Sequence, residues 1–160
     1  MEELPKVIIY TDGSYSRQDL NGGWSAYLIC GEHKLVVGGY GIGTSNNRME
    51  IYAVLHALSV LHVKCDVTIY SDSQYVVKGI KWWIYQWVRN GWKTGEGTPV
   101  KNKDLWEQIY TLTNYHKVNI HWVKAHRNNI GNNFVDHIAQ TLRKNQSTTD
   151  IVYNERIPLK

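Results

Sequence analysis

Cysteine is scarce in this chain of 160 residues, which has only Cys30 and Cys65. Two isolated cysteines without a CxxC pair cannot supply the disulfide framework of a small secreted domain. No apolar run approaches the ~20 residues that cross a membrane, and the acidic, polar start at Met1–Pro5 is unlike a secretory signal. We therefore expect two reduced thiols in a cytoplasmic protein without membrane association, although a nuclear or viral-host location is also compatible.

The chain also lacks internal repeats, low-complexity tracts and a linker to a second domain. Its length allows one domain to bury most of its apolar surface. A content of 42% hydrophobic and 20% charged residues is typical of a soluble globular protein. The expected domain spans residues 1–144, and 145–160 are expected to form a loosely ordered extension because they show no clear periodicity. We expect a monomer.

Positive charge is concentrated in one stretch of the sequence. The whole chain carries 18 basic and 14 acidic residues, a net charge of +4. Between Lys78 and Lys103, six Lys or Arg residues stand against Glu96 alone, so this segment carries +5. Such a segment favours a polyanionic partner, because neutralising phosphates releases counterions. A solvated basic face without a partner is the alternative.

The pattern of apolar residues predicts an α/β fold. Short β-branched runs predict strands, three of them joined by short connections and two reached through helices. We therefore expect a five-stranded mixed sheet, in which an antiparallel hairpin lies beside parallel strands and helices flank the faces. The expected strands are 6–10, 23–29, 34–42, 66–70 and 118–123, and the expected helices are 46–62, 74–79, 81–90, 103–115 and 134–144.

Two aspartates follow apolar strands in the same way. Asp12 and Asp72 each lie at the carboxyl end of a β-branched run, and each precedes a small residue, Gly13 or Ser73. If the two strands are parallel neighbours, these side chains converge at the edge where open α/β sheets bind ligands. Each has a simpler alternative, with Asp12 as a turn former and Asp72 as a helix N-cap.

Two further acids lie on predicted helices. Glu50 is in the first turn of the helix that Asn46 is expected to cap, on its apolar side, so its carboxylate should point towards the sheet. Asp136 lies near the start of the last helix, flanked by Val135 and Ile138. Stabilisation of the helix dipole is the alternative for Glu50, and simple solvation is the alternative for Asp136.

Four clustered carboxylates predict a metal site, since like charges repel and the cluster is costly without a cation. Mg²⁺ prefers oxygen ligands, and two such ions about 3.5–4 Å apart can activate a water molecule and stabilise the leaving oxygen of a phosphodiester. No HxH, HExxH or paired-cysteine spacing competes for zinc or iron. The candidate ligands for two divalent ions are therefore Asp12, Glu50, Asp72 and Asp136.

The chain also contains a series of short motifs, each of them weak by itself. In order they are YTDGS (10–14), TSNNRME (44–50), SDSQYV (71–76), GWKT (91–94), PVKN (99–102), DLW (104–106) and WVKAH (122–126). Their combination in this order is specific. From about Val7 to Arg143, the sequence resembles type 1 ribonuclease H.

This resemblance implies an endonuclease that requires Mg²⁺ or Mn²⁺ and cleaves the RNA strand of an RNA–DNA hybrid, with 1–144 as the catalytic domain. It implies the same five-stranded mixed sheet. The family's catalytic histidine, which assists proton transfer or product departure, falls on His126 in a loop. Its metal-binding acids, which would hold two ions together with substrate, fall on Asp12, Glu50, Asp72 and Asp136.

The resemblance also implies substrate contacts. One group would face the minor groove, where it can sense the 2′-OH that distinguishes RNA from DNA. A second group would line a channel for the DNA strand on a basic, tryptophan-rich protrusion, although part of that tryptophan stripe must be core. The first group is Gly13, Ser14, Asn46, Asn47 and Gln74; the second is Tyr75, Trp83 and Trp87, with Ser45 and Asn102 at a DNA-phosphate pocket and Arg89 and Lys93 as basic contacts.

The sequence departs from the family pattern in its loops. Residues 15–20 (YSRQDL) replace the usual Cys-x-Gly-Asn-Pro-Gly, and 127–131 also differ. Ala125 replaces a glycine before the histidine, and Asn133 replaces a glutamate, which removes one negative charge near the metal site. None of these changes removes a metal ligand.

Other functions share many of these features. A catalytically weak hybrid-binding module would have the same fold, but the four acids are intact. The ribonuclease H part of a reverse transcriptase or viral polymerase is a second alternative; the start at Met1 and the basic tryptophan-rich helix favour a free-standing enzyme. A DNA nuclease or transposase-like relative is a third, and the NNRME and SDSQY segments favour hybrid cleavage over it.

Overall fold

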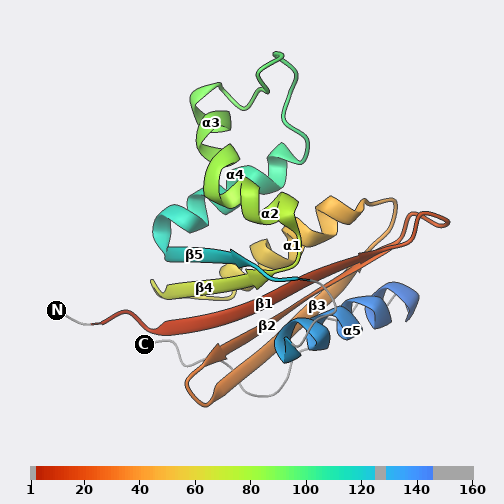
Figure 1. Ribbon diagram of the computed structural model, residues 1–160, viewed down its shortest axis with the longest axis vertical. Coiled ribbons are helices and arrows are strands. Elements are labelled where there is room, and N and C mark those ends of the chain that lie inside the picture. Colours follow the sequence, from red (N-terminus) through yellow and green to blue (C-terminus); the bar gives the residue numbers. More distant parts are fainter. Residues whose placement is uncertain (1–2, 125–128, 146–160) are drawn as a thin grey trace.

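The computed structural model describes residues 3–124 and 129–145 (Figure 1). Within these residues five strands form one sheet, in the order β3-β2-β1-β4-β5. The central strand β1 (Lys6–Tyr15) pairs antiparallel with β2 (Gly22–Cys30) and parallel with β4 (Asp66–Ser71). At the two edges, β3 (His33–Gly41) is antiparallel to β2, and β5 (Lys117–Trp122) is parallel to β4. The predicted mixed sheet is confirmed.

Helices cover both faces of the sheet. Helix α1 (Asn46–Ser59) lies on one face over β1 and β2, and α5 (Ile130–Asn145) lies on the other (Figure 1). Helix α4 (Lys103–Tyr115) packs beside α1. None of the described helices has the length and hydrophobicity that crossing a membrane requires.

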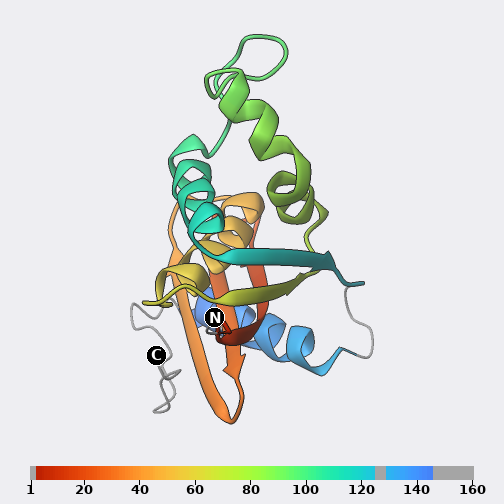
Figure 2. The same cartoon turned by 90° about the vertical axis from the view of Figure 1, so that its left-hand side faces the viewer.

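A helical protrusion stands away from the sheet (Figures 1 and 2). It consists of α2 (Gln74–Lys78), a π-helical turn η1 (Gly79–Trp83) and α3 (Ile84–Arg89), which follow one another without a break. We expected two separate helices with a break at Ile80. The π-helical turn carries the chain through this position because Ile80 is buried and holds the helix against the core.

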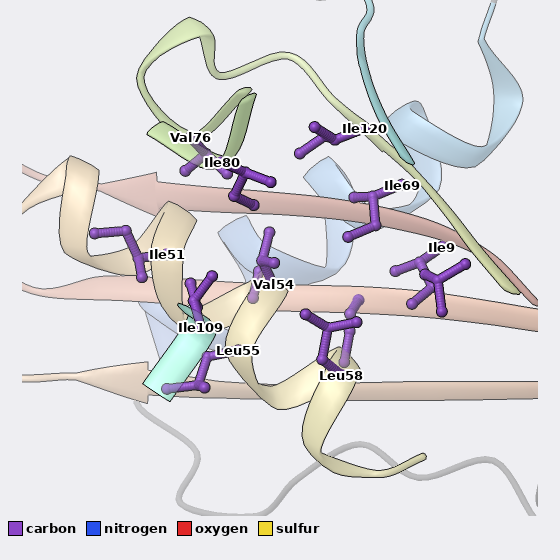
Figure 3. Close-up of a cluster of buried hydrophobic side chains, with 14 of the residues drawn as sticks. Ile9, Ile51, Val54, Leu55, Leu58, Ile69, Val76, Ile80, Ile109 and Ile120 are labelled. Carbon is purple, nitrogen blue, oxygen red and sulfur yellow. The ribbon is translucent and has the colours of Figure 1, made fainter. Parts of the chain in front are cut away.

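The main core lies between α1 and the sheet (Figure 3). Ile9 of β1 and Ile69 of β4 point at the same layer as Val54 and Leu58 of α1, and all four side chains have no exposed surface. Ile109 of α4 closes the layer from the side. Each such side chain contributes about 1.5–3 kcal/mol through burial, so the packing of α1 on β1 and β2 is firmly fixed.

Strand β1 is longer than predicted. Its parallel pairing with β4 ends at Thr11, opposite Ser71, but pairing with β2 continues to Tyr15. Asp12 therefore lies within β1 and not at its end. The two aspartates are still placed side by side as expected, because Asp12 is the first residue beyond the parallel pairing of β1 with β4.

Helix starts also differ from the sequence expectation. The hydroxyl of Ser45, not the amide of Asn46, caps α1 by accepting a hydrogen bond from the Arg48 N–H at 3.2 Å. Helix α5 begins at Ile130, one turn before the predicted start at Phe134. Helix α5 packs on strands β1 and β2. This tertiary packing extends the helix towards its N-terminus, beyond the residues whose apolar spacing predicted it.

The protrusion is attached through Trp106 of α4, which is fully buried. Its indole N–H donates a hydrogen bond to the Tyr75 hydroxyl at 3.1 Å, and its ring lies 5.3 Å from that of Trp87. Gly79 lies directly against the Trp106 ring, so that a methyl group there would overlap the indole. The π-helical turn thus begins at a residue that only glycine can occupy.

We predict that Gly79→Ala lowers the free energy of unfolding by about 1–3 kcal/mol, because the added methyl overpacks the site against a rigid ring. Urea denaturation measures the difference. Gly95→Ala is the matched control, since a Cβ at Gly95 meets no atom within 4 Å. Equal stability of the two variants would show that Gly79 is not a packing constraint.

Candidate metal centre

Three carboxylates meet at the point where β1 and β4 separate. Asp12 follows Thr11, and Asp72 follows the paired Ser71 on the neighbouring strand, so the parallel register places the two aspartates side by side. Glu50 reaches them from α1. One carboxylate oxygen from each of the three residues lies within 4.8 Å of the others. The sequence predicted that these three would converge, and the structure brings them together.

Glu50 enters the cluster because α1 lies very close to β1. A Cβ on Gly13 would lie 2.8 Å from the Glu50 backbone nitrogen and 2.9 Å from its Oε1. Only a glycine therefore allows this approach. Glu50 is 6% exposed, and its Oε1 is buried without any hydrogen-bond partner among the described residues. A buried acceptor without a partner is costly, so this oxygen is placed where a cation would satisfy it.

The alternative role for Asp72, as a helix cap, does not hold. The hydroxyl of Ser73 caps α2 by accepting a hydrogen bond from the Val76 N–H at 3.2 Å. The backbone carbonyl of Asp72 accepts a hydrogen bond from the Trp122 indole at 3.1 Å, which ties the residue to β5. The Asp72 carboxylate contributes one oxygen to the cluster.

Asp136 lies at the edge of the centre, on the second turn of α5. Both of its carboxylate oxygens accept hydrogen bonds from the Gln140 amide, at 3.1 and 3.0 Å. The Asp136 carboxyl also contributes to the raised pKa of Asp12, after burial and the charges of Glu50 and Asp72. It is not one of the three residues whose oxygens gather within 4.8 Å, so α5 supplies a fourth carboxylate beside the cluster.

The cluster is electrostatically unfavourable without a cation. Burial, together with the nearby charges of Glu50 and Asp72, raises the pKa of Asp12 to about 11. Burial and the charge of Asp72 likewise raise the pKa of Glu50 to about 8. No lysine or arginine in the described part of the chain forms a salt bridge with Asp12 or Glu50. Oxygen donors with no countercharge suit a hard divalent cation.

A groove of about 600 Å³ runs beside the centre, between the start of α1, the protrusion and the segment before α4. Asn102, which has a left-handed backbone with φ of +60°, lies in its wall. Trp83 packs behind the groove, with its ring 5.9 Å from that of Tyr75. Of the residues predicted to contact DNA, those that line the groove are Ser45, Tyr75, Trp87 and Asn102, together with Asn47 from the predicted minor-groove group.

The other predicted substrate residues lie on β1, on the first turns of α1 and α2, and at the far end of the protrusion. Asn46 and Gln74 are exposed in the first turns of α1 and α2, and Ser14 follows Gly13 on β1. Arg89 is exposed at the end of the protrusion, and Lys93 is exposed in the loop that follows it. His126 lies outside the described residues.

A match to the RNase H family model covers residues 5–144. The chain belongs to the RNase H family. RNase H enzymes are endonucleases that hydrolyse phosphodiester bonds, and membership makes this chain an enzyme of that class.

RNase H relatives from diverse bacteria match over most of their length. The ribonuclease H of Chromohalobacter salexigens is 43% identical over 137 residues, which are 86% of this chain and 84% of the relative. The ribonuclease H of Prosthecochloris aestuarii is 45% identical over 141 residues, 88% and 97% of the two chains. The ribonuclease HI of Rickettsia conorii is 44% identical over 134 residues, 84% and 88% of the two chains.

Solved structures show the same fold. The crystal structure of a type 1 RNase H with the type 2 active-site motif has a TM-score of 0.85 at 25% identity, and the match covers 96% of this chain and 80% of that one. A foamy viral protease–reverse transcriptase in complex with dsDNA has a TM-score of 0.75 at 22% identity, covering 91% and 99% of the two chains. The second likeness concerns the fold alone.

Two arginines of this RNase H site were missed by reasoning from the sequence. Arg48 donates two hydrogen bonds to the Asp104 carboxylate, at 3.1 and 2.6 Å, and one to the Asn102 side-chain oxygen at 3.2 Å. Arg143 of α5 donates a hydrogen bond to the Ser14 hydroxyl at 2.8 Å. Both pairs join residues far apart in the chain, so no local pattern could have indicated them.

We predict that Asp12→Asn increases the free energy of unfolding of the metal-free protein at neutral pH by at least about 1 kcal/mol. The pKa of Asp12 is higher in the folded state than its ordinary value of 3.8, so the folded protein keeps a proton that the unfolded chain releases. The wild type therefore loses stability as pH rises above about 4, and the advantage of the variant should grow with pH. Urea denaturation at several pH values, with chelator present, measures it.

The control is Asp104→Asn, the same substitution at a carboxyl whose pKa is lowered by its hydrogen bond to Arg48. It should decrease stability at neutral pH, the opposite sign. If Asp12→Asn also decreased the stability of the metal-free protein, the carboxylate cluster would not be a source of repulsion.

Proposed function

We propose that this RNase H cleaves the RNA strand of RNA–DNA hybrids with two divalent metal ions bound at Asp12, Glu50, Asp72 and Asp136. The observation that carries the proposal is the Glu50 carboxylate, which is buried with one oxygen, Oε1, unpartnered among the described residues, and which has an oxygen within 4.8 Å of oxygens from Asp12 and Asp72. A carboxylate held in this way without a cation would be a net cost to the fold. The cluster is explained if its oxygens are metal ligands.

Mg²⁺ fits this centre best, and Mn²⁺ would also fit, because all the candidate donors are carboxylate oxygens. When bound, two such ions would lower the pKa of the attacking water and stabilise the leaving oxygen. Asp12, Glu50 and Asp72 supply the ligands that are already gathered. Asp136 would join them by giving up its hydrogen bonds from Gln140.

Recognition of the RNA strand follows from the groups next to Asp12. Gly13 and Ser14 continue along β1 from the centre, and Asn46, Asn47 and Gln74 begin the two helices beside it. Amide and hydroxyl groups at this position can hydrogen-bond to the 2′-OH and base edges of the minor groove without reading sequence. Arg143 holds the Ser14 hydroxyl in place.

The DNA strand would occupy the groove beside the protrusion. Tyr75, Trp83 and Trp87 provide aromatic surface there, and Arg89 and Lys93 provide positive charge for phosphates. Ser45 and Asn102 would bind one DNA phosphate at the end of the groove.

One chain supplies both the acids and the groove, so we propose that the enzyme acts as a monomer. A role for His126 in proton transfer or product departure stays a prediction, since it lies outside the described residues.

We predict that Asp72→Asn abolishes cleavage of a labelled RNA–DNA hybrid while leaving its binding intact. The substitution removes a metal ligand but keeps the shape of the site. Cleavage of hybrid, double-stranded RNA and duplex DNA is measured with Mg²⁺, with Mn²⁺ and with chelator, and binding is measured by anisotropy in chelator. The wild type should cut only the hybrid, and only with metal.

Asp66→Asn is the control, because Asp66 lies at the opposite end of β4 from the centre. Turnover by Asp72→Asn at the wild-type rate would rule out the metal-site assignment. Cleavage of duplex DNA at a comparable rate would point to a DNA nuclease, and binding of hybrid without cleavage by the wild type would point to a binding module.

We predict that Arg89→Ala and Lys93→Ala each weaken hybrid binding and reduce the slope of log affinity against log salt concentration by about 1. Anisotropy titrations at several salt concentrations measure the slope. Lys34→Ala is the control, since Lys34 is an exposed lysine at the far end of the sheet, on the β2–β3 hairpin. A slope that is the same for all three variants and the wild type would contradict contact between the protrusion and phosphates.

A further inference from the structure

The protrusion has a second aromatic surface that the proposed substrate groove does not use. Trp82 is 58% exposed and Tyr85 is 50% exposed, whereas the ring of the neighbouring Trp83 packs edge-on against Tyr75 and at a tilt against Trp87. Trp82 and Trp83 are adjacent in sequence, so they leave the helix in different directions. Two large aromatic side chains exposed within four residues, on a helix whose other tryptophans are packed, indicate a binding surface.

A recess of about 220 Å³ lies beside Tyr85, between the protrusion and the edge of the sheet. Lys81 and Tyr85 form one wall, and Asn119 and His121 of β5 form the opposite wall. Strand β5 is the edge strand on this side of the sheet. The recess therefore combines an aromatic ring with polar groups that can donate and accept hydrogen bonds.

This surface is basic. The Lys81 ammonium lies 5.8 Å from the centre of the Trp82 ring, so the cation and the aromatic face are presented together. Lys78 and Arg89 are exposed further along the same helix. No acidic residue lines the recess in the part of the chain that the structure describes. Positive charge interleaved with aromatic rings matches the requirements of a nucleic-acid strand whose bases are unstacked.

We propose that this outer face, formed by Lys81, Trp82, Tyr85, Asn119 and His121, binds single-stranded nucleic acid. Bases stack on Trp82 and Tyr85, the recess takes one base edge against the polar groups of β5, and Lys81 contacts the phosphates. A duplex cannot use this surface, because its bases are already stacked and paired. If the proposed function also holds, the strand bound here is a single-stranded extension of the hybrid.

The test uses Trp82→Ala and Tyr85→Ala in the full chain. The affinity for a fluorescein-labelled oligothymidylate of about 15 nucleotides is measured by anisotropy, with chelator present. Each variant should lose at least about fivefold in affinity, because stacking of a base on an aromatic side chain is lost. Gln86→Ala is the matched control, since Gln86 is an exposed residue next to Tyr85 that does not line the recess. It should bind as the wild type does, and thermal melts of all the variants report whether the helix remains folded.

A second measurement compares a blunt hybrid with one that carries a single-stranded DNA extension. The wild type should bind the extended hybrid more tightly, and the two aromatic variants should lose this difference while cleaving the blunt hybrid normally. Unchanged oligothymidylate affinity in both variants would overturn the proposal and assign the face to a protein partner. If the wild type failed to cleave the hybrid, only the proposed function would be contradicted. The proposed single-strand binding would stand, because it is measured without metal.

Discussion

The mutual repulsion of buried carboxylates is the constraint on which this site depends. Asp12 and Glu50 are almost fully buried, and this burial together with the nearby charge of Asp72 raises their pKa values. The hydrophobic layer between α1 and the sheet supplies the free energy that keeps them there. Gly13 serves both the packing of α1 on the sheet and the gathering of the carboxylates, since it lets α1 approach β1 closely enough for Glu50 to reach the aspartates.

A second constraint organises the protrusion. Trp106 is fully buried under it and contacts Gly79, Tyr75 and Trp87. These contacts fix which side of the helix faces the groove, and they leave Trp82 and Tyr85 on the outside. The aromatic residues of this short segment therefore divide into packing, groove-lining and exposed groups. The basic charge is shared by both surfaces, which is why the composition of the segment indicated nucleic acid without indicating where it binds.

Most of the fold and three of the four acids could be predicted from the sequence. The β-branched runs before Asp12 and Asp72 and the inward position of Glu50 are local patterns, and the sheet order confirms them. Asp136 could not be placed by pattern, because it is one charge among several on α5 and its position next to Asp12 arises from helix packing. The N-cap of α1 could not be predicted by pattern either. Ser45 and Asn46 are both residue types that suit an N-cap, and only the backbone geometry selects Ser45.

The sequence by itself therefore determined the strands and helices, the mixed sheet and the two acids that follow the parallel pairing of β1 with β4, because these follow from periodicity and residue type over short distances. Only the tertiary structure decided how the acids stand relative to one another, which tryptophans are packed and which are exposed, and that Arg48 and Arg143 hold Asn102 and Ser14. The reason is physical: burial, repulsion and hydrogen bonding act between residues that lie far apart in the chain and come together only when it folds.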